Sequence, residues 1–261
     1  MTLTQGIVLF LAAVLGGTLN SVAGGGSFIT FPMLLSTGVP GIQANVTNTV
    51  ALWPGGVAAV GGYRGKFDTP LPTLLLLVTT SLVGGLLGAL LLLHTPQATF
   101  LALVPYLLLL ATLLFWFGGA ATTWLRARMG TRHVPRWLAT GGIILLQLVI
   151  ASYGGFFGGG ISILMLALLA VMGMENIHTM NALKALLAAC INGVAVVAFI
   201  IAGAVLWPQA LLMAAGAIVG GYGGASLARR IAPKLIRRFV IVVGLSVSAY
   251  FFVSPYLFAR H

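Results

Sequence analysis

The stretch that decides the fold is residues 23–32, AGGGSFITFP, where three successive glycines interrupt a long apolar tract. Glycine has no Cβ atom, so the backbone can leave helical geometry there without a steric cost. Ser27 follows the glycines and is expected to cap a helix that restarts at this point. The first N–H groups of a helix lack intrahelical partners and carry partial positive charge. The break therefore predicts an anion-binding site built from backbone.

The composition places this break inside a membrane. Of the 261 residues, 60% are hydrophobic and 6% are charged, and apolar runs of about 20 residues recur along the chain. The net charge of +11 would suggest nucleic acid on a soluble chain. Here the basic residues fall mostly in short loops between apolar spans, as cytoplasmic loops require. We therefore expect an all-α integral membrane protein that contacts the lipid bilayer and no nucleic acid.

The chain repeats itself. The glycines of residues 81–91 return 136 positions later, in residues 217–227, and the opening break returns in GGGISILML at residues 158–166. The matched glycines of the first pair are Gly84 with Gly220, Gly85 with Gly221 and Gly88 with Gly224. We expect membrane repeat one over residues 1–125, a cytoplasmic basic loop over 126–136 and membrane repeat two over 137–261.

Basic residues orient the two repeats in opposite directions. Arg64 and Lys66 follow the third apolar segment of the first half. In the second half the basic residues, from Arg229 to Arg238, follow the fourth segment instead. This exchange predicts inverted repeats, with all basic segments in the cytoplasm and both termini outside.

Each repeat is expected to hold about five helical elements. The expected segments are residues 4–22, 27–37, 43–62, 70–93 and 97–119, then 137–156, 161–173, 178–204, 208–228 and 235–257. Segment 27–37 is too short to cross a bilayer, because 11 residues extend about 16 Å. We interpret it and segment 161–173 as short broken or re-entrant helices.

Broken helices at matching positions of inverted repeats indicate a transporter's substrate site. The alternative is that the glycines serve close helix packing alone. Nearby polar residues favour a site, since Asn45 and Asn48 share a helix face, as do Asn181 and Lys184. Lys184 is placed inside a hydrophobic span, where a charge usually faces a cavity, although it could snorkel to the interface. The predicted substrate-binding residues are Gly24, Gly25, Gly26, Ser27, Asn45, Asn48, Gly158, Gly159, Gly160, Ser162, Asn181 and Lys184.

Other chemistry has little support in the sequence. There is no metal-ligand cluster or nucleotide-binding loop, so we expect no enzyme activity, metal or cofactor. Cys190 is the single cysteine and is expected to be a buried small hydrophobe. Glu175 and His178 could move protons, but helix capping explains Glu175 more simply.

At residues 24–56, GGGSFITFPMLLSTGVPGIQANVTNTVALWPGG, the chain resembles the sulfite exporter TauE/SafE family, also called the toluene-sulfonate uptake permease family. Residues 154–166, GGFFGGGISILML, and 180–197, MNALKALLAACINGVAVV, resemble that family's repeated segment. The resemblance covers about residues 5–255. It implies a multi-pass carrier of the bacterial inner membrane for small sulfur-containing anions, such as sulfite, sulfonates or sulfoacetate.

The predicted function is secondary transport of such an anion. Export is the expected direction, because a membrane potential negative inside drives anions outward without further coupling. An anion channel of similar architecture and a non-transporting membrane scaffold are the alternatives. Both a monomer and a homodimer fit the sequence.

Overall fold

The computed structural model describes residues 1–22, 25–63, 69–129, 136–228 and 233–258, and these residues form helices with no strand among them. The helices within these ranges are α1 (Leu3–Val22), α2 (Ser27–Ser36), α3 (Gly41–Gly62), α4 (Leu71–His94), α5 (Gln97–Met129), α6 (Arg136–Phe156), α7 (Ile161–Val171), α8 (Ile177–Ile201), α9 (Trp207–Ala228) and α10 (Pro233–Phe258). Among the described residues, α1, α4, α5 and α8 contain stretches long and apolar enough to cross a membrane.

The expected segments and the observed helices agree closely except between the two halves. There α5 continues to Met129 and α6 begins at Arg136. Arg126 and Arg128, expected in a loop, therefore lie in the last turn of α5. Arginine is a good helix former, so a membrane helix can extend past the bilayer through such residues. The remaining connection, residues 130–135, lies outside the described part of the chain, as do Arg64, Lys66, Arg229 and Arg230.

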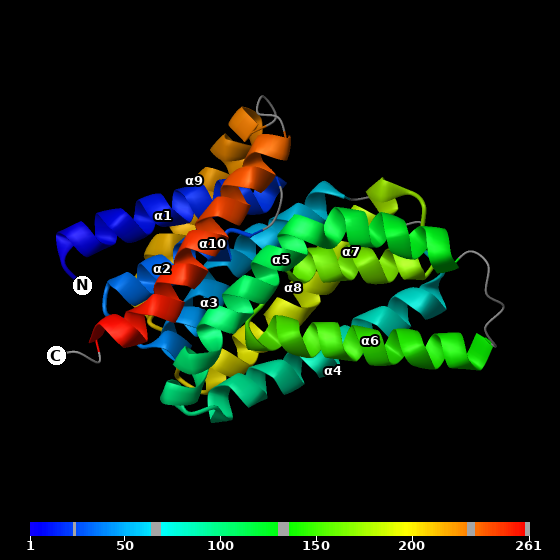
Figure 1. The fold of residues 1–261 in the computed structure, drawn as a ribbon, viewed down its shortest axis with the longest axis horizontal. Helices are drawn as coiled ribbons and strands as arrows, with labels where there is room; N and C mark the ends of the chain where they lie inside the picture. Colours follow the sequence, from blue (N-terminus) through cyan, green and yellow to red (C-terminus); the bar gives the residue numbers. More distant parts are fainter. Residues whose placement is uncertain (23–24, 64–68, 130–135, 229–232, 259–261) are drawn as a thin grey trace.

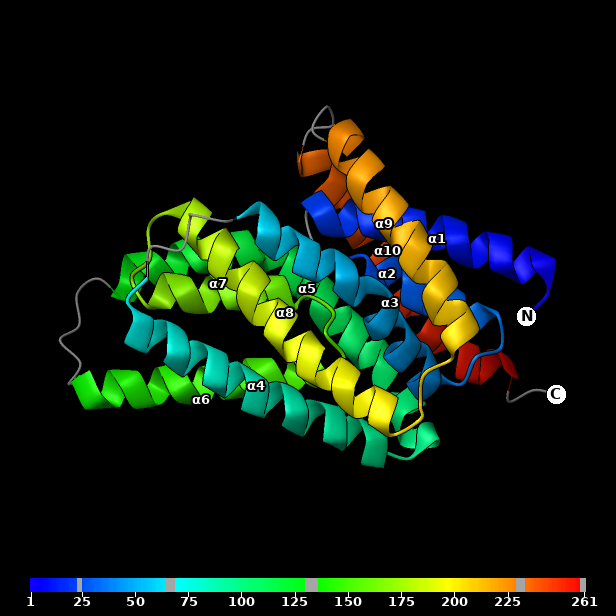
Figure 2. The same ribbon diagram turned by 180° about the vertical axis from the view of Figure 1, so that it is seen from behind.

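Helices of the first half pack mainly against helices of the second. α1 lies along α9 and α4 lies along α6, and these are the two most extensive helix pairs (Figures 1 and 2). Further contacts join α5 to α10, α4 to α8, α3 to α9 and α3 to α8. The two halves are therefore interlocked rather than stacked as separate bodies.

Glycines allow the two main pairs to approach at the backbone. A Cβ atom on Gly220 of α9 would collide with the carbonyl oxygen of Val14 in α1. A Cβ atom on Gly88 of α4 would collide in the same way with the carbonyl oxygen of Ser152 in α6. Small residues are what permit such close packing between membrane helices, where burial of apolar side chains gives little advantage over lipid.

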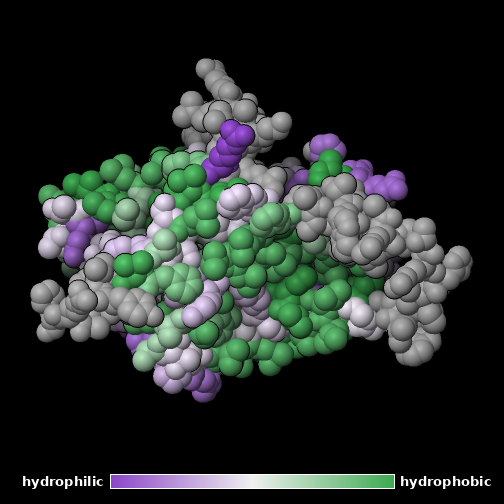
Figure 3. Space-filling model, viewed as in Figure 1, coloured by the Kyte–Doolittle hydropathy of each residue, from purple (hydrophilic) through white to green (hydrophobic). Residues whose placement is uncertain are grey.

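The connections between helices gather on two sides of the molecule. The start of α1 and the end of α10 lie on one side, together with the α4–α5 and α8–α9 connections (Figures 1 and 2). The end of α5, the start of α6, the end of α9 and the start of α10 lie away from that side. Hydrophobic side chains cover the middle of the surface in Figure 3, while hydrophilic ones lie toward its edges. Exposed leucines such as Leu87, Leu145 and Leu211 fit contact with lipid.

An aromatic core holds the short helix α2 against the second half. The Phe31 ring of α2 meets that of Phe157, just beyond α6, edge to face at a centroid distance of 5.7 Å. Phe100 of α5 packs on Phe31 at 6.4 Å and on Phe156 of α6 at 5.9 Å. Edge-to-face pairs add to the stability gained by burial. This cluster places the first glycine break close to the second.

Candidate functional site

The first break interrupts the chain where the sequence predicts it. α1 ends at Val22 and α2 begins at Ser27, while Gly24 lies outside the described residues. Gly25 has a φ of +96°, a backbone conformation that favours glycine. The Gly26 N–H donates to Oδ1 of Asn20 at 2.8 Å. This N–H is therefore already paired within the protein and is not free for an anion.

The expected cap at Ser27 is wrong. The residue before α2 is Gly26, with φ −54° and ψ −32°, and no side chain caps the helix. A capping serine must stand outside the helix with non-helical dihedrals, whereas Ser27 is already its first residue. The Ser27 hydroxyl oxygen instead accepts a hydrogen bond from Nδ2 of Asn48, at 3.1 Å. Ser27 therefore joins α2 to α3.

Asn48 also reaches the next turn of α2. Its Oδ1 lies within hydrogen-bond distance of the Thr30 hydroxyl, which is also 3.0 Å from the carbonyl oxygen of Gly26. A hydroxyl has one proton, so Thr30 can donate to one of these two acceptors at a time. Thr30 and Asn48 are buried, with exposed fractions of 0% and 1%. Both the Nδ2 and the Oδ1 of Asn48 therefore contact side chains of α2 next to the first break.

The second break leaves backbone donors free. α6 ends at Phe156 and α7 begins at Ile161, and Gly158 and Gly160 have φ of +78° and +75°. The Ile161 and Ile163 N–H groups bond to the carbonyl oxygens of Gly158 and Gly160. Within the described part of the chain, the N–H groups of Gly159, Gly160 and Ser162 have no acceptor. These are the donors that a helix start offers to an anion.

Asn45 connects α3 to the second break. Its Nδ2 donates to the carbonyl oxygen of Phe156, the last residue of α6, at 2.9 Å. Asn45 and Asn48 are three residues apart on one helix, so their side chains start about 5–6 Å apart. One of them binds the edge of the second break and the other binds the first. The structure therefore brings the two breaks together around the first half of α3.

Asn181 and Lys184 form a separate pair on α8. The Lys184 Nζ donates to Oδ1 of Asn181 at 3.0 Å, and the Asn181 Nδ2 donates to the carbonyl oxygen of Ile177. Among the described residues, no hydrogen bond joins this pair to either break. The positions that correspond to Asn45 and Asn48 thus have different partners in the second half.

Comparison with known proteins identifies the chain at this point. Residues 9–251 match the family described as Sulfite exporter TauE/SafE. The chain belongs to this family. It is 31% identical to "Probable membrane transporter protein ORF9" of Sinorhizobium sp, over 95% of this chain and 92% of that protein. It is 29% identical to "Probable membrane transporter protein YfcA" of Escherichia coli strain K12, over 93% and 87%. No solved structure matches the chain.

This TauE/SafE protein is thus a member of a membrane transporter family. Three residues that hydrogen-bond beside its two glycine breaks were not predicted from the sequence. Asn20 accepts from the Gly26 N–H, and the Tyr153 hydroxyl donates to the carbonyl oxygen of Gly159 at 2.6 Å. Each of these side chains stands six positions before the glycine that it holds. A polar residue six positions before a glycine of each run was the sequence signal that could have identified Asn20 and Tyr153. Thr30 had no such signal, because its role depends on α3.

Glu175 does not cap α8, contrary to the simpler sequence interpretation. The cap is Asn176, whose Oδ1 accepts from the N–H groups of His178 and Thr179. Asparagine is preferred there because its short side chain reaches back to the second and third residues of the helix. Among the described residues there is also no cluster of His, Cys, Asp and Glu suited to a metal ion.

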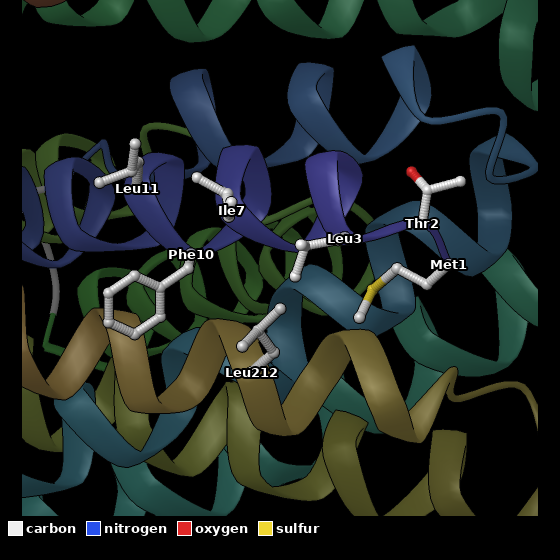
Figure 4. A pocket seen from close by; sticks show the side chains of 8 residues that line it. Met1, Thr2, Leu3, Ile7, Phe10, Leu11 and Leu212 are labelled. Carbon is white, nitrogen blue, oxygen red and sulfur yellow. The ribbon is translucent and has the colours of Figure 1, made fainter.

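One pocket of the protein lies away from the two glycine breaks. It has a volume of 560 Å³ and lies between the start of α1 and Leu212 of α9 (Figure 4). Apart from Thr2, its lining side chains are apolar, among them Leu3, Ile7 and Phe10. A small oxyanion needs polar donors, so this pocket does not suit the predicted substrate.

Proposed function

We propose that the protein is a secondary transporter that exports a small sulfur-containing anion of the sulfite, sulfonate or sulfoacetate type. The observation that carries the proposal is the bridging of two broken helices by Asn45 and Asn48. Glycine breaks in both halves meet at one place inside a chain of a transporter family. Broken helices that meet in this way form the substrate sites of many secondary transporters.

The chemistry of the residues around the breaks suits an oxyanion. The free N–H groups of Gly159, Gly160 and Ser162 offer hydrogen-bond donors, and no carboxylate belongs to the predicted site. The Asn45 and Asn48 amides and the Ser27 hydroxyl add donors that could rearrange toward a ligand. Lys184 would supply positive charge to the transport path from α8. Hydrogen bonds to a charged oxygen are stronger than neutral ones, which favours an anion over a neutral solute.

We further infer that the chain consists of two inverted repeats, α1–α5 and α6–α10. The pattern of helix contacts supports this, because exchanging the halves converts every substantial contact except α3–α5 into another substantial contact or into itself. The α1–α9 pair becomes α6–α4, and α3–α9 becomes α8–α4. The pairs α5–α10 and α3–α8 become themselves. Such a pattern is expected when a pseudo-twofold axis relates the halves.

We place the protein in the inner membrane of a bacterium, with the basic segments in the cytoplasm. The family resemblance and the positive-inside rule support this orientation. A membrane potential that is negative inside then favours outward movement of anions, so export needs no second substrate.

Purified protein in liposomes tests the function directly. Vesicles loaded with labelled sulfite should lose it faster when the protein is present, and unlabelled sulfite outside should accelerate the exchange. Sulfate, thiosulfate, taurine, sulfoacetate and acetate provide the comparison set. Saturable exchange supports a carrier. Flux that never saturates would indicate a channel, and no flux of any anion in the set would refute transport of this substrate class.

A further inference from the structure

Two equivalent glycines have different neighbours. Gly85 of α4 and Gly221 of α9 are 136 positions apart and occupy matching places in the two glycine tracts. α4 packs against α8, and α9 packs against α3, which is the counterpart of α8. In a symmetric arrangement Gly221 would therefore meet α3 as Gly85 meets α8.

The contact at Gly85 is closed. A Cβ atom on Gly85 would lie 2.9 Å from the carbonyl oxygen of Ile191 and 2.9 Å from a methyl carbon of Val194. The neighbouring residues of α8 are buried, since Ala195 is 0% exposed and Val196 is 4% exposed. Helices α4 and α8 thus touch at the backbone along this part of their length.

The contact at Gly221 is open. No atom of a described residue lies within 4 Å of a Cβ atom placed on Gly221. At the same interval of 136 positions, the α8 residues that crowd Gly85, Ile191 and Val194, correspond to Gly55 and Ala58 of α3, in the sequence GGVAA at residues 55–59. In α3 this sequence is exposed: Val57 is 45% exposed, and a Cβ atom placed on Gly55 or Gly56 would have no described atom within 4 Å.

The departure from symmetry is confined to the contact of α9 with α3, because α9 packs on α1 as closely as α4 packs on α6. A Cβ atom on Gly220 would collide with the Val14 carbonyl oxygen, as one on Gly84 would meet the Leu148 carbonyl oxygen at 2.8 Å. The Thr18 hydroxyl also lies 3.0 Å from the carbonyl oxygen of Gly220. Side-chain size does not explain the gap either, since the atoms that crowd Gly85 include backbone atoms of Ile191.

We propose that Gly221 and residues 55–59 of α3 close against each other in a second conformation of the transport cycle. This contact, which we name the α3–α9 seam, would then resemble the closed contact of Gly85 with α8. The structure described here has the seam open on the side where α3 and α9 end, and the equivalent contact closed. Small residues on a helix surface permit another helix to approach closely at the backbone. The inference rests on the proposed transport function, because exchange of conformations between inverted repeats produces alternating access.

A bulky residue at Gly221 should block closure without disturbing the open form. Gly221→Leu has space in the present structure, so the variant should fold and should keep the rise in Tm caused by sulfite. Sulfite exchange in liposomes should fall roughly tenfold or more, because one conformation is lost. Gly142→Leu is the matched control, since Gly142 of α6 also has no described atom within 4 Å of its Cβ position. Exchange at the wild-type rate in Gly221→Leu would overturn the proposal.

A pair of introduced cysteines tests whether α3 and α9 approach each other. In a Cys190→Ser background, Ala58→Cys, at the counterpart of Val194, and Gly221→Cys should form an intramolecular disulfide in membranes under mild oxidation. A disulfide requires Cα atoms within about 7 Å, so it forms only if the seam closes. Ala58→Cys paired with Gly142→Cys should not react. Absence of the first crosslink would refute the seam. A disulfide-linked dimer from Ala58→Cys alone would also refute it, because the α3 face would then be an interface between copies of the chain.

The two experiments separate the seam from the transport function. If the crosslink forms but no anion of the set is exchanged, the seam stands and the proposed substrate class falls. If sulfite is exchanged at the wild-type rate by both Gly221→Leu and the oxidised pair, the function stands and the seam falls.

Discussion

The indole N–H of Trp53 donates to the backbone carbonyl oxygen of Ala189 at 3.0 Å, and these residues are 136 positions apart, the interval that separates matching residues of the two halves. In the proposed inverted repeat, a residue that contacts its own counterpart lies beside the pseudo-twofold axis. The ring also lies over Gly193, whose Cβ position is 3.3 Å from it. Trp53 therefore fixes α3 against α8 where the halves meet.

Trp53→Phe should keep most of this packing and lose the hydrogen bond. We expect a loss of about 1 kcal/mol in the free energy of unfolding, the usual contribution of one such bond. Thermal unfolding in detergent measures it as a lower Tm. Trp207→Phe, at the exposed start of α9, is the control and should change Tm little. Equal Tm values for wild type and Trp53→Phe would contradict the role given to this bond.

The Thr30–Asn48 contact should appear as coupling between two substitutions. Thr30→Val and Asn48→Ala each remove the same buried contact, so their effects on stability should be less than additive by about 0.5–3 kcal/mol. Chemical unfolding of the two single variants and the double variant gives this coupling energy. Thr30→Val combined with Thr47→Val is the control, because Thr47 accepts instead from the N–H of Leu206. Full additivity for Thr30 and Asn48 would show that the two side chains act independently.

The glycine with free donors at the second break can be tested against a glycine of similar conformation. Gly160 and Gly173 have φ of +75° and +82°, so alanine costs about 1–2 kcal/mol of backbone strain at either position. Gly160→Ala should reduce sulfite exchange roughly tenfold or more, because its methyl group would lie 3.3 Å from Ala111 of α5 and would displace the free N–H groups beside it. Gly173→Ala, which meets no described atom within 4 Å, should retain exchange near the wild-type rate.

A glycine within a helix contact, such as Gly88, would not serve as the comparison, since a Cβ atom on Gly88 would collide with the Ser152 backbone. If Gly160→Ala and Gly173→Ala reduce exchange equally, strain alone explains the loss and the second break does not bind substrate.

Lys184→Met should weaken sulfite binding roughly tenfold with little change in Tm, because it removes a charge that has no carboxylate partner among the described residues. The sulfite-induced rise in Tm measures the binding. Lys184→Arg should restore binding only in part, since the guanidinium group is larger and planar. Wild-type affinity in Lys184→Met would indicate that this lysine merely extends to the membrane interface.

Cysteine labelling on intact cells checks the orientation. Leu71→Cys at the start of α4 and Trp207→Cys at the start of α9 occupy exposed positions. Leu71 follows the α3–α4 connection and Trp207 follows the α8–α9 connection, which the charge pattern places on opposite sides of the membrane. The charge pattern predicts that an impermeant reagent added outside labels Trp207→Cys and leaves Leu71→Cys unlabelled. The reverse result would show that the chain is inserted the other way round.

The sequence alone predicts most of the helices and both breaks, because hydropathy and glycine runs act locally. The extents of α2 and α7 follow directly from the glycines that precede them. The partners of the polar residues depend on tertiary packing instead. Nothing in the sequence indicates that Asn45 bonds to Phe156 and Asn48 to Ser27, two residues from different halves. The pairing of Asn48 with α2 also explains why the expected cap at Ser27 is absent.

The pairing of α1 with α9 has a consequence for biosynthesis. α1 ends at Val22 and α9 begins at Trp207, so the ribosome must complete most of the chain before this pair can form. The grooves at Gly17 and Gly88 that receive helices of the second half would face lipid during this time. A newly inserted first half therefore lacks its main packing partners until the second half has been synthesised and inserted. Truncation between the halves should leave two fragments that are each degraded alone and persist when synthesised together.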